Sequence, residues 1–172
     1  MKKAVRIFAI TVCILILIGT VVFTVPFFGF GKSYEKVSAE AAALYGLDIN
    51  DYEVSFQKKV RNSQGESVQG IIAYSGEKKP TIKIQKSWSR PMVIATIFHE
   101  FAHAAQYAYD LDMGNYTREQ HAEVLSFSVM WSSKYWWNCL HLIPVHMVGK
   151  PKEYRATNDL FSIMFTGAKV SF

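Results

Sequence analysis

The sequence predicts an α+β domain preceded by one membrane-spanning helix. Three observations lead to this fold class: an uncharged apolar run follows a basic N-terminus, three short segments in the middle of the chain alternate like strands, and two long segments with helical spacing come after them. The 172 residues suffice for one domain with a real core but not for two sizeable ones. We therefore expect one functional site.

The N-terminal segment, residues 1–31, is expected to be the membrane helix. No charged residue occurs in residues 7–31, a run longer than the roughly 20 apolar residues that a spanning helix needs. Lys2, Lys3 and Arg6 precede it, which favours a cytoplasmic N-terminus and an extracytoplasmic position for the rest of the chain. We interpret the segment as an uncleaved signal anchor, because no small-residue cleavage site follows it; a cleaved signal peptide is the alternative.

The remaining residues, 33–172, form the predicted domain, which begins with a short helix and a sheet. Ser33 is an N-cap candidate for a helix that ends at Gly46. Strand patterns then occupy Tyr52–Val60, Val68–Tyr74 and Thr81–Lys86. The turn-rich links between these runs predict a small antiparallel sheet. The lysines of the third run suit a sheet edge, where an extended substrate could pair; a plain edge strand is the alternative.

Two long helices are expected to pack on this sheet. Ser89 as N-cap and Pro91 in the first turn open the first, which contains MVIATIFHEFAHAAQYAY. Thr117 and Gln120 form a capping-box pattern that opens the second, over residues 117–137. The last thirty or so residues contain a connector broken by proline and glycine, and a further helix could begin at residue 154.

The first long helix carries the motif His99-Glu100-Phe101-Ala102-His103. Residues at i and i+4 share one face of a helix, so both imidazoles can reach one Zn²⁺ ion. Glu100 is turned about 100° from His99 and can bond a water molecule at the metal instead. The motif predicts a zinc site in which Glu100 is the general base of a hydrolytic reaction.

A third protein ligand is expected, because catalytic zinc usually has three. The second long helix offers Glu119, His121 and Glu123. Glu119 and Glu123 share a helix face, whereas His121 points about 160° away from Glu119. The spacing favours one carboxylate as the ligand and the other as the group that orients a histidine, but it leaves all three residues open.

HEFAH followed by a helix with Glu119-Gln120-His121-Ala122-Glu123 resembles the gluzincin family of zinc metallopeptidases, whose second helix often reads ExxAD or ExxAN. The resemblance covers about residues 68–130. It implies a zincin-like fold, peptide-bond hydrolysis, zinc ligation by His99, His103 and Glu119, and the base role for Glu100. It also implies that Glu123 holds a ligand histidine in its orientation. This chain departs from the family in having Glu123 in place of Asp or Asn, and in the short gap between His103 and Glu119.

Other residues and partners are open at this point. His121, Tyr154, His141 and His146 are candidates for an oxyanion donor or an alternative ligand. The expected partners are a peptide or protein substrate and a membrane. Nucleic acid is not expected, because the net charge is only +5 and the lysines are scattered.

Two rival interpretations stand beside the peptidase. In one, a non-catalytic, membrane-anchored domain of this fold binds a metal or a partner without turnover. In the other, HEFAH is an ordinary buried helix without metal. The intact Glu100 favours catalysis, because a purely structural metal site has no need of that carboxylate.

Overall fold

The computed structural model describes residues 10–14, 33–76, 78–87 and 89–139. The chain divides into two compact units, Met1–Gly31 and Lys32–Phe172. In the first unit, the described residues 10–14 are helical. The second unit is α+β, as expected, and contains the residues that carry the predicted chemistry.

The structure corrects the membrane-spanning part of the predicted fold. A bilayer crossing takes about 20 consecutive apolar residues in one helix. Within the part of the chain that the structure describes, no helix has that length and apolarity. The described helix of the predicted anchor covers residues 10–14 alone, and the rest of residues 1–31 lies outside the described ranges. On this finding the prediction of a transmembrane helix is wrong, and so is that of a single-pass localisation.

Side-chain caps mark the start of two of the three main helices. The three helices are α2 (Tyr34–Leu44), α3 (Arg90–Ala108) and α4 (Arg118–Trp131). Ser33 caps α2 by accepting a hydrogen bond from the Lys36 N–H. At the start of α4, Thr117 and Gln120 form the predicted capping box, in which each side chain accepts from the backbone N–H of the other. At the third helix, α3, Ser89 is the N-cap residue but its side chain makes no capping hydrogen bond, and Pro91 lies in the first turn. A short 3₁₀ helix, η1 (Ile49–Asp51), connects α2 to the sheet.

The second long helix is shorter than predicted. α4 ends at Trp131, and the chain makes a turn before residues 136–139 become helical again. The Ser133 hydroxyl donates to the Met130 carbonyl at 2.8 Å and accepts from the Tyr135 N–H at 3.1 Å. Serine side chains compete in this way with helical backbone bonds. The prediction of one continuous helix over residues 117–137 is therefore wrong beyond Trp131.

The sheet has a different order from the predicted antiparallel one. Its strands are β1 (Glu53–Gln57), β4 (Gly70–Ala73) and β5 (Thr81–Gln85), and β5 lies in the middle. β5 pairs parallel with β1 and antiparallel with β4. A separate antiparallel ribbon consists of β2 (Val60–Arg61) and β3 (Ser67–Val68).

The prediction that residues 81–86 form a sheet edge is also wrong. Ile82 and Ile84 are fully buried and Lys83 is exposed. The alternation of apolar and polar residues therefore shows which face of the strand is buried, and it does not show whether the strand has neighbours on both sides. Both edges of β5 are paired, which leaves no room there for an extended substrate. Among the described strands, β4 is an outer strand of this sheet.

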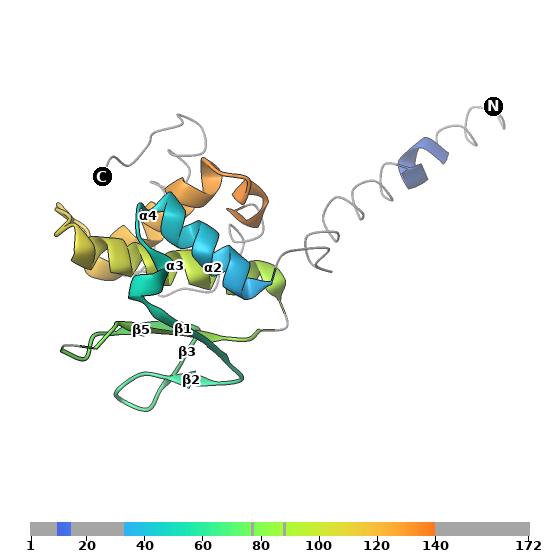
Figure 1. Ribbon diagram of the computed structural model, residues 1–172. Coiled ribbons are helices and arrows are strands. Elements are labelled where there is room, and N and C mark those ends of the chain that lie inside the picture. The colour runs from blue at the N-terminus through green and yellow to red at the C-terminus, as the bar shows by residue number, and fades with distance from the viewer. Residues whose placement is uncertain (1–9, 15–32, 77, 88, 140–172) are drawn as a thin grey trace. The chain divides into compact units, whose positions relative to one another are not determined.

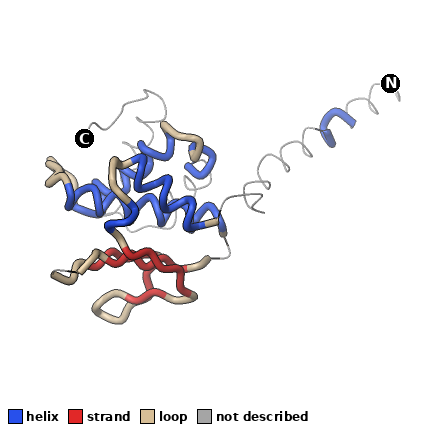
Figure 2. Tube along the Cα trace, in the orientation of Figure 1, coloured by secondary structure: helices blue, strands red, loops and turns tan. Residues whose placement is uncertain are grey.

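The helices form one layer on one side of the sheet (Figures 1 and 2). α3 packs against β4 and β5 below it, and against α2 and α4 beside it. Phe98 and Phe101 of α3 and Leu125 of α4 are fully buried in this layer. The packing holds α3 between α4 and the outer strand β4, where the candidate site lies.

Candidate metal centre

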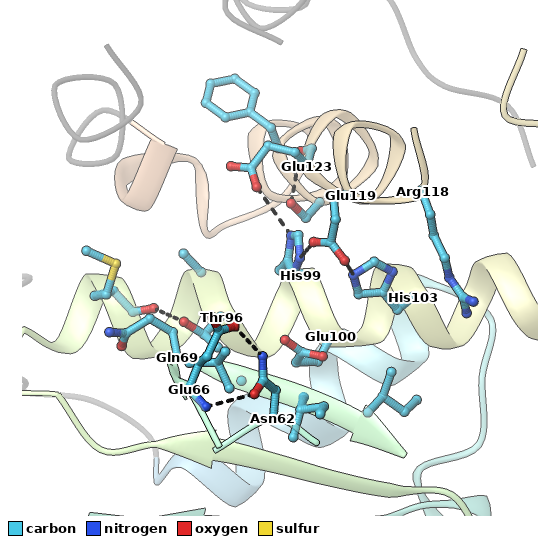
Figure 3. A pocket seen from close by; sticks show the side chains of 18 of the residues that line it. Asn62, Glu66, Gln69, Thr96, His99, Glu100, His103, Arg118, Glu119 and Glu123 are labelled. Atoms are coloured by element: carbon cyan, nitrogen blue, oxygen red, sulfur yellow. Dashed lines mark hydrogen bonds and ion pairs between the residues drawn. The ribbon is translucent and has the colours of Figure 1, made fainter. Parts of the chain in front are cut away.

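α3 and α4 run in opposite directions and bring the predicted motif and the predicted third ligands together (Figure 3). His99 and His103 are one turn apart on α3, with ring centroids 4.7 Å apart. Glu119 and Glu123, one turn apart on α4, both point toward these rings.

Glu119 lies between the two histidines. Its Oε2 is 3.2 Å from His99 Nε2, and its Oε1 is 3.2 Å from His103 Nε2. The donor atoms of the three residues all lie within 4.8 Å of one another. Ligand atoms around a tetrahedral zinc ion, each about 2.1 Å from the metal, are about 3.4 Å apart. The group His99, His103 and Glu119 can therefore hold a metal ion.

The outer ring nitrogens also have partners, which fix how the rings face the centre. His99 Nδ1 lies 3.3 Å from Glu123 Oε2, and His103 Nδ1 lies 2.8 Å from Gln106 Oε1. Gln106 Oε1 is an acceptor, so His103 carries a proton on Nδ1 and turns Nε2 toward Glu119. His99 Nδ1 is buried and makes no hydrogen bond with the described residues, and the Glu123 carboxylate beside it is an ion-pair contact. Metal-binding histidines are oriented by such outer partners. The arrangement places Glu123 beside a ligand candidate rather than within the ligand group.

Gln106 extends this network in a way that the sequence did not indicate. Its side chain is buried, and its Nε2 donates to the Arg118 carbonyl and to His121 Nδ1, both at 2.9 Å. His121 therefore accepts at Nδ1 and faces Gln106, outside the metal group. The sequence offered only a weak signal, a polar residue that follows two alanines one turn after His103.

The neighbouring carboxylates favour a proton on His99. Burial alone would lower the pKa of His99, but the carboxylates of Glu119 and Glu123 outweigh it and raise the pKa to about 10. The hydrogen bonds of Glu119 with His103 and then with His99 hold the pKa of its carboxyl far below its usual range. A protonated imidazole cannot bind a metal, so metal binding here must displace a proton.

Glu100 is separate from the ligand group. Only 5% of it is exposed, on the side of α3 that faces β4 (Figure 3). Burial raises the pKa of its carboxyl, and the charge of His99 and the Ile72 N–H oppose part of the rise. β4 comes close because residue 70 is glycine: a Cβ there would lie 2.5 Å from Glu100 Oε1 and 2.6 Å from Thr96 Cγ2.

A cavity of about 710 Å³ opens over this centre. Its walls come from α3, α4, β4 and the β2–β3 ribbon, and they include Glu100 and all three residues of the metal group. Asn62 closes the turn of the ribbon, where its Oδ1 accepts from the backbone N–H groups of Gln64 and Glu66. The metal group is thus accessible to a ligand bound in this cavity.

Three predicted residues cannot be placed. Tyr154, His141 and His146, the other oxyanion or ligand candidates, lie outside the described residues. The described part of the cavity wall contains Tyr74 and Arg118, which the sequence did not indicate.

Comparisons with known proteins give no independent assignment. No protein-family model matches the chain, and no curated protein and no solved structure is significantly similar to it. The functional argument therefore depends on the residues of the centre.

Proposed function

We propose that this protein is a zinc-dependent peptidase that hydrolyses peptide bonds. The donor set supports zinc: two imidazole nitrogens and one carboxylate oxygen are the protein ligands of many catalytic zinc sites, which keep a fourth position for water or substrate. Bound there, zinc supplies a Lewis acid that polarises a carbonyl and lowers the pKa of a water molecule to about 7.

The position of Glu100 carries the proposal. It is a buried carboxylate next to the metal group but not part of it, and burial raises its pKa above the ordinary value of a glutamate. A carboxylate in this place can take and return a proton. In the proposed reaction, its carboxylate takes one proton from the attacking water. The water oxygen bonds to the carbonyl carbon, the C–N bond breaks, and Glu100 returns the proton to the leaving amine.

The outer strand supports a peptide as the substrate. Residues Gly70 to Ile72 of β4 line the cavity, and among the described strands β4 pairs with one neighbour, β5. An extended peptide can pair with such an edge through main-chain hydrogen bonds. This pairing would place a peptide bond beside Glu100 and the metal group.

The test is Glu100→Gln in the full chain, loaded with zinc. The amide keeps the shape but cannot carry the proton, so cleavage of a quenched fluorescent peptide library should fall by about 10²- to 10⁴-fold while zinc content stays unchanged. Glu66→Gln is the matched control, because it removes an exposed carboxylate from the same cavity wall and should cleave like the parent.

Equal cleavage by Glu100→Gln and the parent would reject the mechanism. If the parent binds zinc but cleaves no peptide in the library, the non-catalytic metal-binding alternative stands instead.

A further inference from the structure

The cavity has two chemically different ends. The contacts between α3 and α4 show that the two helices are antiparallel. Going forward along α3, the contacts go backward along α4: first His99 with Glu123, then His103 with Glu119, then Gln106 with the Arg118 carbonyl. The metal group therefore lies in the middle of the cavity wall. Beyond His99 lies one end, and beyond His103 lies the other.

The end beyond His99 is apolar. Met92 and Ala95 of α3 and Phe127 and Met130 of α4 line it. Methionine side chains adapt to apolar groups of different shapes. This end therefore suits an apolar side chain.

The end beyond His103 contains Arg118. It is the one lysine or arginine on the described wall of the cavity, and no carboxylate of the described residues lies within ion-pair distance of it. The nearby carboxylates have other partners: Glu119 and Glu123 contact the histidines. The Arg118 guanidinium is thus available to an anionic ligand.

Tyr74 provides a second, independent observation at this end. Tyr74 lines the same cavity, and its hydroxyl is buried without a hydrogen-bond partner among the described residues. Burial, with Tyr52, raises its pKa to about 12 against the opposing effect of Arg118, so the hydroxyl keeps its proton and can donate. The Tyr107 ring, 4.1 Å away between centroids, holds the Tyr74 ring in place. A buried donor without an acceptor is unfavourable, and a ligand oxygen would satisfy it.

The direction of β4 determines which part of a bound peptide lies at each end of the cavity. Gly70 lies against Thr96 and Glu100, and Tyr74 lies against Tyr107, so β4 runs in the same direction as α3. Antiparallel pairing is the more stable mode and is the one that β4 already uses with β5. A peptide antiparallel to β4 enters with its N-terminal part at the Arg118 end and leaves at the Met92 end.

We propose that Arg118 and Tyr74 form a subsite for an aspartate or glutamate side chain on the N-terminal side of the cleaved bond, with an apolar residue on the C-terminal side. This inference rests on the proposed peptidase function and names its substrate class. Among the residues that the structure describes, the Arg118 guanidinium and the Tyr74 hydroxyl have no acidic partner. Both groups are donors, and a carboxylate can accept from both.

The experiment compares two peptides that differ only in Glu or Gln at one position N-terminal to the cleaved bond. The parent protein should prefer the Glu peptide by roughly tenfold in kcat/KM, the size of one charge-assisted hydrogen bond at a partly exposed site. Arg118→Gln should abolish the preference, Arg118→Lys should keep part of it, and Tyr74→Phe should reduce it. Lys83→Gln is the matched control, because it removes an exposed cation that does not line the cavity.

A binding measurement separates this inference from the proposed function. In the Glu100→Gln background, fluorescence anisotropy of the two labelled peptides should show the same preference without cleavage. Equal binding and equal cleavage of the two peptides by the parent would overturn the subsite and leave the peptidase intact. A binding preference that depends on Arg118, in a protein that cleaves neither peptide, would support the subsite and overturn the peptidase.

Discussion

Replacing Gly70 with alanine should separate the position of Glu100 from metal binding. Gly70 is where β4 crosses close to α3, and its Cα faces the Glu100 carboxyl and the Thr96 methyl group. None of the residues of the metal group is among the nearest neighbours of this position. An added methyl group should therefore move the proposed base while leaving the ligands in place.

The size of the effect follows from the contacts. The new Cβ would lie 2.5 Å from Glu100 Oε1 and 2.9 Å from its Cδ, whereas ordinary contact begins near 3.4 Å. The carboxyl must therefore retreat by about 0.9 Å. A misplacement of about 1 Å in a catalytic group can cost about 10²-fold in rate, and overpacking costs about 1 to 3 kcal/mol of stability.

The assay measures kcat for peptide cleavage and zinc affinity on the same Gly70→Ala preparation. We expect kcat to fall about 10²-fold and zinc affinity to stay within about twofold. Gly65→Ala is the matched control: its φ of +83° disfavours alanine, but a Cβ there meets nothing within 4 Å. It should lose comparable stability and keep its activity.

Two results would refute this reasoning. If Gly70→Ala loses zinc along with activity, the close approach of β4 to α3 holds the metal ligands in place and not Glu100 alone. If Gly70→Ala and Gly65→Ala show the same small loss of activity, the effect is one of stability alone.

Three further predictions concern the metal group. Glu119→Gln should weaken zinc binding strongly, because an amide is a poorer ligand than a carboxylate, whereas Glu123→Gln should weaken it less. Isothermal titration calorimetry with zinc measures both affinities. A larger loss for Glu123→Gln than for Glu119→Gln would make Glu123 the ligand. Gln106→Leu removes the acceptor at His103 Nδ1 and should cost about 10- to 100-fold in zinc affinity, and an unchanged affinity would remove Gln106 from the centre. The pKa of His99 is about 10 without metal, so zinc must displace a proton that becomes easier to remove as the pH rises. Zinc affinity should therefore increase about tenfold per pH unit between about pH 6 and 8. A zinc affinity that does not change with pH would contradict this.

The sequence predicted the helices better than the sheet because helix signals are local. The Thr117–Gln120 capping box and the Ser33 cap act within one turn, and both are present. The order of the strands depends instead on contacts between distant residues. The alternation in Thr81–Gln85 showed which side chains are buried, but not that β1 pairs with β5 in parallel.

The same distinction applies to the site. The spacing of His99, His103, Glu119 and Glu123 follows from helix periodicity, so the sequence indicated which side chains could face one another. It could not indicate Gln106, whose role needs the approach of α4 to α3.

Tyr74 and Arg118 lay outside the sequence prediction for the same reason. They come from different elements and line one cavity only after β4 and α4 have packed against α3. The predicted substrate strand at residues 81–86 failed likewise, since the neighbours of a strand are not encoded in its own alternation.

The most direct test of the metal assignment is a crystal structure of the zinc-loaded protein with anomalous data at the zinc absorption edge. We predict one strong peak at about 2.0 to 2.2 Å from His99 Nε2, His103 Nε2 and a Glu119 carboxylate oxygen, with Glu123 still beside His99 Nδ1. A peak bound by Glu123 or His121 in place of Glu119, or no peak at this centre, would contradict the account.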